Sequence, residues 1–387
     1  MYNLYIFFVI IHLGDIMTWF LLVLTITLIV LVPVNIYIAS KIHKFEIIKK
    51  IKNKKLAWLV SFPFLLITLL LLLWNATNAN IIVLHFAAII ALSEFVYHIV
   101  CMCKRIMDLK YGQEVVICVA LVVTTVYLGI AYYIAHNVVE THYEVVATKD
   151  LGVDSFRIVQ VTDSHIGATM SGDTFYNYML DINETDPDIV VVTGDFIDDD
   201  TKLDDMIRAC EGLGTLKTKY GVFFAYGNHD KGYFDYRGYN NDRLQEELKK
   251  NNVVILEDEG LDIVGNIYLY GRQDRSTKGR ITAEELMKDI DPDKYVIVLD
   301  HQPNDYENEK NAKMDLVISG HTHGGQVFPL QIIDKMIGAN NQIYGIETRD
   351  NTTFIVSSGI GDWAVKFKTG TVAEYVVIDL KNVIWYN

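Results

Sequence analysis

The sequence predicts two unlike parts, an all-α membrane domain over residues 1–142 and an α/β domain over residues 143–387. The first part contains long apolar segments that are nearly free of charge, as helices that cross a bilayer require. The second part contains short runs of β-branched and aliphatic residues bounded by Gly, Asp and Asn, which are typical of buried strands. The two parts also differ in charge. The first contains 10 Lys and Arg against 6 Asp and Glu, and the second contains 24 Lys and Arg against 42 Asp and Glu.

Four segments of the membrane domain are each about 18 or more residues long, which is the length that a bilayer core requires. We expect each of them to form a transmembrane helix. They cover residues 18–39, 57–74, 81–102 and 115–135.

Basic residues predict how these helices are oriented. Seven lysines lie between residues 41 and 55, after the first span, and Lys104, Arg105 and Lys110 follow the third. Because basic connections stay in the cytoplasm, the uncharged link 75–80 is expected outside. Four spans then put the α/β domain of this multi-pass cell membrane protein on the extracytoplasmic side, whereas the loss of one span would reverse this.

Two ionisable residues lie within the third predicted span. Glu94 and His98 are four residues apart and therefore share a helical face. Ionisable groups at this depth are candidates for transport or sensing. A mutual hydrogen bond inside the helical bundle is the simpler explanation.

Five short apolar runs in the α/β domain each lead into polar residues that bind metals in many proteins. The runs cover residues 158–161, 189–192, 222–224, 295–299 and 316–318. Because loops at strand ends carry most of the chemistry of layered α/β folds, we expect the polar residues to gather at one sheet edge. They are Asp163 and His165, Asp195 and Asp198, Asn228, His229 and Asp230, His301, and His321 and His323.

These residue types indicate a pair of divalent cations. Each ion needs several oxygen or nitrogen ligands and an open position for water and substrate. Two ions about 3.5–4 Å apart usually share a bridging carboxylate, and Asp195 is the natural bridge. The ligand types accept Mn, Fe, Zn, Ni or Co.

Each motif has a simpler explanation when it is taken alone. Gly-Asn-His-Asp is also a turn with capping side chains, and Gly-His-Thr-His is also a hairpin end. For Asp198 two roles are open: its side chain accepts a hydrogen bond from a metal ligand, or it begins a solvated helix. The dinuclear site is favoured because five of the eleven histidines fall behind strands in this order.

The order and spacing of the motifs resemble the calcineurin-like metallophosphoesterase superfamily. The stretch 316–327, LVISGHTHGGQV, is similar to the bacterial, membrane-associated, YkuE-like branch. The resemblance implies a four-layer αββα sandwich, in which two packed sheets are flanked by helices. It also implies one ion held by Asp163, His165, Asp195 and His323, and another held by Asp195, Asn228, His301 and His321. By the same resemblance His229 is the proton donor, oriented by Asp230.

This assignment implies a phosphoesterase mechanism that is chemically consistent. Two cations neutralise the charge of a phosphate ester and lower the pKa of a bridging water. An imidazole near its ordinary pKa can protonate the leaving oxygen. We therefore expect a membrane-anchored enzyme that hydrolyses phosphodiester or phosphomonoester bonds, with a membrane lipid or cell-envelope molecule as the preferred substrate.

Composition excludes one class of substrate and leaves two alternatives open. An acidic domain argues against nucleic acid as substrate or partner. A soluble nucleotide pyrophosphatase or phosphomonoesterase and a non-catalytic membrane receptor or scaffold are the alternatives. The segment 361–367 departs from the expected pattern, because Lys366 stands where the resemblance favours an arginine.

Overall fold

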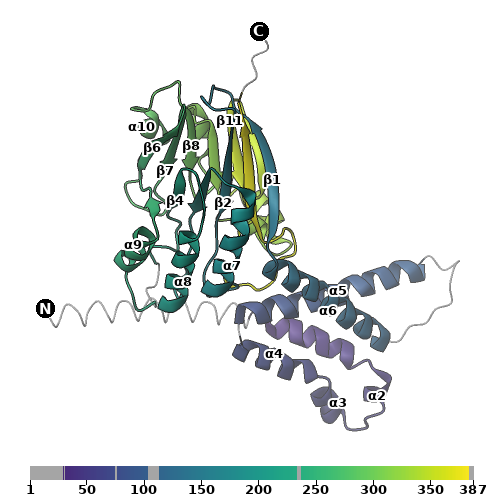
Figure 1. Cartoon of the computed structure of the whole chain (residues 1–387). Coiled ribbons are helices and arrows are strands. Elements are labelled where there is room, and N and C mark those ends of the chain that lie inside the picture. The colour runs from purple at the N-terminus through teal and green to yellow at the C-terminus, as the bar shows by residue number, and fades with distance from the viewer. Residues whose placement is uncertain (1–28, 30, 75, 103–112, 233–236, 383–387) are drawn as a thin grey trace. The chain divides into compact units, whose positions relative to one another are not determined.

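The computed structural model describes residues 29, 31–74, 76–102, 113–232 and 237–382 (Figure 1). The chain forms two compact units, Met1–Ile130 and Ala131–Asn387. The division falls inside the helix α6 (Gln113–His136), so the last residues of this helix belong to the C-terminal unit.

The N-terminal unit is helical wherever the structure describes regular structure. Its elements are an apolar helix at Leu31–Ile42, α2 (Glu46–Lys49), α3 (Lys54–Val60), α4 (Pro63–Trp74), α5 (Ala76–Met102) and most of α6. Three described segments are long and apolar enough to cross a membrane, namely Lys54–Leu72, Asn78–Val96 and Glu114–His136. They overlap the second, third and fourth predicted spans. Most of the first predicted span, 18–39, lies outside the described residues.

Glu94 of α5 has partners that the sequence analysis did not foresee. Its carboxylate accepts hydrogen bonds from the ammonium of Lys41 and, at 3.4 Å, from the hydroxyl of Tyr37. An ammonium so close to the carboxylate offsets the cost of placing a charge in an apolar bundle. Glu94 thus forms an ion pair with another helix, and its expected hydrogen bond to His98 stays a prediction.

The C-terminal unit contains two six-stranded sheets. The first has the order β1-β12-β2-β3-β4-β5, and its strands are β1 (Val139–Val146), β2 (Ser155–Val161), β3 (Ile189–Thr193), β4 (Gly221–Ala225), β5 (Val253–Ile255) and β12 (Glu374–Lys381). The second has the order β10-β11-β9-β8-β7-β6, and its strands are β6 (Glu259–Val264), β7 (Ile267–Gly271), β8 (Tyr295–Leu299), β9 (Leu316–Ser319), β10 (Gly345–Arg349) and β11 (Thr352–Val356).

All five predicted apolar runs are strands, in β2, β3, β4, β8 and β9. Every residue of β3, β8 and β9 is buried. Parallel strands covered on both faces are apolar throughout, which explains why these runs do not alternate with polar residues.

Three cores separate four layers, which confirms the predicted αββα sandwich. Ile158 and Phe223 of the first sheet pack with Ile297 and Ile318 of the second in the central core. The outer face of the first sheet is covered by α7 (Gly172–Ile182), α8 (Leu203–Gly214) and α9 (Asn241–Lys250) (Figure 1). The outer face of the second sheet is covered by α10 (Ala283–Met287) and α11 (Tyr306–Asn311).

Hydrogen bonds join the ends of the parallel strands of the two sheets. Gln160 of β2 donates its side-chain amide to the carbonyl of Ser319 in β9 at 2.7 Å. The backbone N–H of His321, two residues after β9, donates to both carboxylate oxygens of Asp163 at 2.9 Å. The loops after these strands therefore meet at one edge of the sandwich.

Candidate metal centre

The backbone of the strand-end loops holds an uncommon conformation at most of the expected metal ligands. Five of these residues have a positive φ, a region that residues other than glycine rarely adopt and that costs on the order of 1–3 kcal/mol each. They are Asp163 (53°), His165 (38°), Asp195 (50°), His321 (71°) and His323 (50°). Such strain persists only where the surrounding fold fixes the loop, so these side chains are held in place by the folded chain.

Two glycines of the motifs permit the close approach of neighbouring loops. A Cβ atom at Gly227 would lie 2.2 Å from Oδ1 of Asp195, and one at Gly320 would lie 2.2 Å from Oδ2 of Asp163. Both contacts are far shorter than atoms tolerate. The glycines of Gly-Asn-His-Asp and Gly-His-Thr-His are therefore required by packing against the carboxylates.

The first ligand cluster consists of Asp163, His165 and His323, all buried, with ligand atoms within 4.8 Å of one another. Nε2 of His323 lies 3.7 Å from Oδ1 of Asp163. Nε2 of His165 lies 3.6 Å from Oδ2 of Asp195. The cluster thus opens towards Asp195.

The second ligand cluster consists of Asp195, His301 and His321, again with ligand atoms within 4.8 Å of one another. Nε2 of His301 lies 3.1 Å from Oδ2 of Asp195, while its Nδ1 lies 2.8 Å from the carbonyl of Thr193 and donates to it. This hydrogen bond places a proton on Nδ1 and orients Nε2 towards Asp195. The Oδ2 atom of Asp195 therefore faces imidazoles of both clusters.

Asn228 lies next to these clusters on the loop after β4. The following backbone N–H, that of His229, donates to Oδ1 of Asp195 at 2.8 Å. The side-chain oxygen of Asn228 accepts from the amide of Gln302 at 3.4 Å. Gln302 is in turn held by Asp274, at 2.9 Å and 3.1 Å. The sequence analysis did not identify Gln302 or Asp274.

The carboxylate beside the His229 ring is Asp198, which corrects the expected role of Asp230. Oδ1 of Asp198 lies 3.0 Å from Nδ1 of His229, and its Oδ2 lies 3.3 Å from Nδ1 of His165. Asp230 instead turns into the domain and accepts four backbone N–H groups. The donors are those of Asp195, Phe196, Ile197 and Gly227, at 2.7–3.2 Å. Buried backbone donors need partners, and this demand fixes Asp230 away from the expected position.

Charges in the cluster move the pKa values of these groups. Burial favours neutral His229, but its hydrogen bond to Asp198 and the charges of Asp195 and Asp198 raise its pKa to about 9. Burial and the nearby Asp195 charge raise the pKa of Asp230 to about 6. Burial and the charge of His301 lower the pKa of His321 to about 4, which keeps this imidazole neutral, as a metal ligand must be.

The donor set fits two divalent cations. Among the described residues, Nε2 of His165 and Nε2 of His301 are buried and have no hydrogen-bond partner. A buried polar atom without a partner costs about 1–3 kcal/mol. Both atoms face Asp195, and carboxylate, imidazole and amide groups are the ligands of borderline divalent metals. Metal ions would satisfy these atoms.

A buried ion pair behind His323 was missed by the sequence analysis. Oδ1 of Asp362 lies 3.5 Å from Nδ1 of His323 and 3.0 Å from Nζ of Lys368, and both Asp362 and Lys368 are fully buried. Lys368 also donates to the carbonyl of Ser358 at 2.6 Å. A signal existed, because a Gly-Asp pair, Gly361-Asp362, lies five residues beyond the buried strand β11. The buried lysine is Lys368, whereas the sequence analysis had singled out Lys366.

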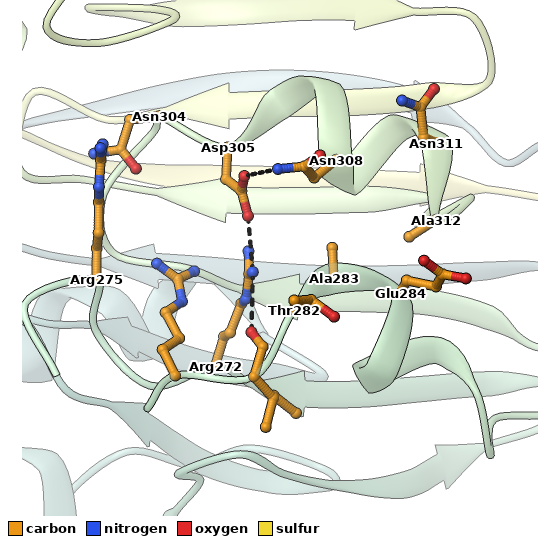
Figure 2. A pocket seen from close by; sticks show the side chains of 12 residues that line it. Arg272, Arg275, Thr282, Ala283, Glu284, Asn304, Asp305, Asn308, Asn311 and Ala312 are labelled. Carbon is orange, nitrogen blue, oxygen red and sulfur yellow. Dashed lines mark hydrogen bonds and ion pairs between the residues drawn. The ribbon is translucent and has the colours of Figure 1, made fainter. Parts of the chain in front are cut away.

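A polar cavity of about 630 Å³ lies beside the loops that follow β7 and β8. Figure 2 shows Arg272 between the carboxylate of Asp305 and a backbone carbonyl. Arg272 also donates to Asp300 at 3.0 Å and to Glu309 at 3.2 Å, and only 3% of its side chain is exposed. Because Asp300 directly precedes His301, this ion-pair network supports the second ligand cluster.

Known proteins resemble the C-terminal unit. A family model described as calcineurin-like phosphoesterase matches residues 156–325. A metallophosphoesterase of Campylobacter jejuni is 33% identical over 230 residues, which cover 58% of this chain and 59% of the relative. One from Aquifex aeolicus is 30% identical over 232 residues, covering 58% of this chain and 85% of the relative.

The metallophosphoesterase YkuE of Bacillus subtilis is 26% identical over 264 residues, which cover 66% of this chain and 90% of the relative. This chain spans less than two thirds of the length of the Campylobacter protein. The order of strands, the metal-binding motifs and these relatives agree. The chain belongs to the calcineurin-like metallophosphoesterase family.

Proposed function

We propose that the protein is a membrane-anchored phosphoesterase with two divalent metal ions, which hydrolyses a phosphodiester or phosphomonoester bond. One observation carries the proposal: a single buried carboxylate, that of Asp195, faces both His165 of the first ligand cluster and His301 of the second. In this proposal residues 1–142 are the membrane domain and residues 143–387 the catalytic domain.

The expected ligands divide between the two ions. The first ion is held by Asp163, His165, Asp195 and His323, and the second by Asp195, Asn228, His301 and His321. When bound, the ions neutralise the phosphate charge and supply a nucleophilic water at neutral pH.

His229 is the proposed proton donor to the leaving oxygen. Its Nδ1 lies against Asp198, so the opposite nitrogen, Nε2, is the atom that carries the proton to the substrate. The ring of Trp363 lies 5.7 Å from the His229 ring, centroid to centroid. This half-exposed indole shields one side of the donor from water. Asp230 contributes by fixing the loops that carry Asp195 and His229.

Three apolar helices support an anchored enzyme, and a lipid or cell-envelope phosphoester is the substrate class we favour. Anchoring raises the local concentration of a substrate carried in the same bilayer. With four spans the catalytic domain would face the extracytoplasmic side.

A soluble nucleotide is the second candidate substrate. The polar cavity beside the loops that follow β7 and β8 is lined by Arg275 and Arg280 together with Asn304 and Asn308. Guanidinium and amide donors suit the phosphates of a nucleotide.

The test is turnover by the full-length protein, purified with Mn²⁺ supplied. Elemental analysis should find about two ions per chain, and a panel of water-soluble phosphodiesters, phosphomonoesters and nucleoside diphosphates should show which bond is cleaved. His229→Ala should lower turnover by about 10²–10⁴-fold without loss of metal. Protein that holds less than one ion per chain, or that cleaves neither these substrates nor phospholipids in nanodiscs, would contradict the proposal.

A further inference from the structure

The helix α12 (Leu330–Ile337) turns its apolar side outwards. None of its residues is buried. Met336 is 80% exposed and Ile337 is 71% exposed. All the apolar side chains of the helix are exposed, namely Leu330, Ile332, Ile333, Met336 and Ile337. A surface helix in water normally turns such residues towards the core, whereas α12 exposes them.

The polar residues of α12 hold the helix to the domain. Gln331 donates its side-chain amide to the carbonyl of Gly324 at 2.5 Å, within the turn that follows the ligand His323. Asp334 accepts from the amide of Asn340 at 3.1 Å. The apolar side chains are therefore left exposed, with Ile332 and Met336 at the edge of an open hollow beside Tyr344, and α12 is bonded to the residue that follows the ligand His323.

The start of α12 is bonded to the segment 367–373. The backbone N–H of Phe328 donates to the hydroxyl of Thr369 at 2.7 Å, and the N–H of Thr369 donates to the carbonyl of Gln326 at 2.9 Å. Phe328 is itself 54% exposed, so the apolar surface continues onto it.

The same segment contacts the last turns of α6 that belong to the C-terminal unit. The N–H of Lys368 donates to the carbonyl of Ala131 at 3.0 Å, and the N–H of Ala373 donates to that of Ile134 at 3.4 Å. The ring of Tyr132 lies 6.2 Å from that of Phe367, edge to face. Segment 367–373 therefore joins the base of α12 to the end of an apolar helix.

The end of α6 has the features of a helix that leaves a membrane. Its apolar stretch, Glu114–His136, is long enough to cross a bilayer. Tyr132 and Tyr133 in its last turns are exposed, and tyrosines gather where transmembrane helices meet the headgroups. The residues at which such a helix leaves a bilayer are thus hydrogen-bonded to the segment that also holds the start of α12.

We propose that α12 and Phe328 lie in the lipid–water interface of the bilayer that α6 crosses, and so present the metal centre to phosphoesters carried by lipids. The second clause rests on the proposed function. Interfacial helices bury their apolar side in the headgroup region. Eight residues suffice here, because the attached transmembrane helix keeps α12 at the surface.

Fluorescence quenching tests where α12 lies. Met336→Cys would carry an environment-sensitive fluorophore in full-length protein whose three cysteines in the membrane domain are replaced by alanine. The buried Cys210 is kept, since burial raises the pKa of its thiol and makes it unreactive. In nanodiscs, lipids spin-labelled near the headgroup should quench this fluorophore at least threefold. The matched control is Val254→Cys on β5, exposed to 42%, which should show no quenching.

Two results would overturn the interfacial position. One is equal quenching at positions 336 and 254. The other is a blue-shifted fluorophore at position 336 that lipids do not quench and that stays blue-shifted in detergent, since a second copy of the chain would then cover α12.

Turnover tests how the metal centre is presented. The triple variant Ile333→Ser, Met336→Ser, Ile337→Ser should hydrolyse phosphatidylglycerol or phosphatidic acid in nanodiscs about tenfold more slowly than the unaltered protein. Metal content equal to that of the unaltered protein would show that the variant is folded. An unchanged rate on lipid would overturn the presentation of lipid substrates. If the unaltered protein cleaves neither lipids nor water-soluble esters, the proposed function fails, and the quenching experiment still decides the position of α12.

Discussion

The two ligand clusters use the same residue types but are supported by different groups. In the first cluster, carboxylates lie behind the imidazoles, Asp198 behind His165 and Asp362 behind His323. In the second cluster, His301 is held by a backbone carbonyl. The carboxylates of the first cluster carry charge, whereas the carbonyl carries none.

From this difference we infer which of the two ions binds with the higher affinity. A carboxylate behind a histidine makes the imidazole a stronger base and a better ligand. The first cluster has two such pairs. We therefore expect the first ion to stay bound under conditions in which the second exchanges.

Asp195→Asn removes the group that the clusters share and should have the largest effect. Loss of the shared charge should release both ions and reduce turnover to background, because the repulsion between two cations is no longer offset. Elemental analysis measures this directly. Asp379→Asn is the matched control, since its carboxylate pairs with Arg157 far along β12. If Asp195→Asn retained two ions, Asp195 would not be the ligand that the two clusters share.

Arg272→Ala tests the support behind the second cluster. Removing one partner of a buried ion pair costs about 3–5 kcal/mol. Without Arg272 the carboxyl group of Glu309 is left buried without a cation, and Asp300 keeps only Arg280. Thermal unfolding of the full-length protein should show this loss. Arg208→Ala is the control: its partners Asp173 and Glu211 are exposed, so the unfolding temperature should fall much less than in Arg272→Ala. Similar shifts for both variants would show that the network does not support the fold.

Asp362→Asn tests the support behind the first cluster. We expect the affinity of one ion to fall by about 10–100-fold and that of the other to stay unchanged. Mn²⁺ titration followed by electron paramagnetic resonance separates the two sites. Equal weakening of both ions would mean that the clusters do not differ in the way proposed.

Gln302→Ala should have the smallest effect. The amide of Gln302 is 3.4 Å from the oxygen of Asn228, a weak contact with a neutral group. We expect less than about a tenfold change in the affinity of the second ion. The same titration measures it, and a larger change than that of Asp362→Asn would reverse the ranking of the two supports.

Much of the fold could be predicted from the sequence, because buried parallel strands appear in it as short, uninterrupted apolar runs. The runs in β3, β8 and β9 are apolar from end to end, and their positions were predicted correctly. The polar residues behind these strands lie together as expected. Their roles as ligands stay predictions.

Other features depend on how side chains turn, which neighbours in sequence do not reveal. The resemblance gave Asp230 the role of orienting His229, and four backbone N–H groups hold its carboxylate elsewhere. Asp198 was left open and lies beside His229. Asp362 and Lys368 are in a segment whose burial depends on distant strands. The outward turn of α12 was equally hidden, because an apolar helix has the same sequence whichever side it presents.

The left-handed backbone at five expected ligands has a consequence for how ions enter the site. The conformational entropy of arranging these side chains is lost when the chain folds, before any ion arrives. Binding then needs little further ordering of the protein. The step that limits uptake should be the removal of water from the incoming cation, so faster-dehydrating metals should load first.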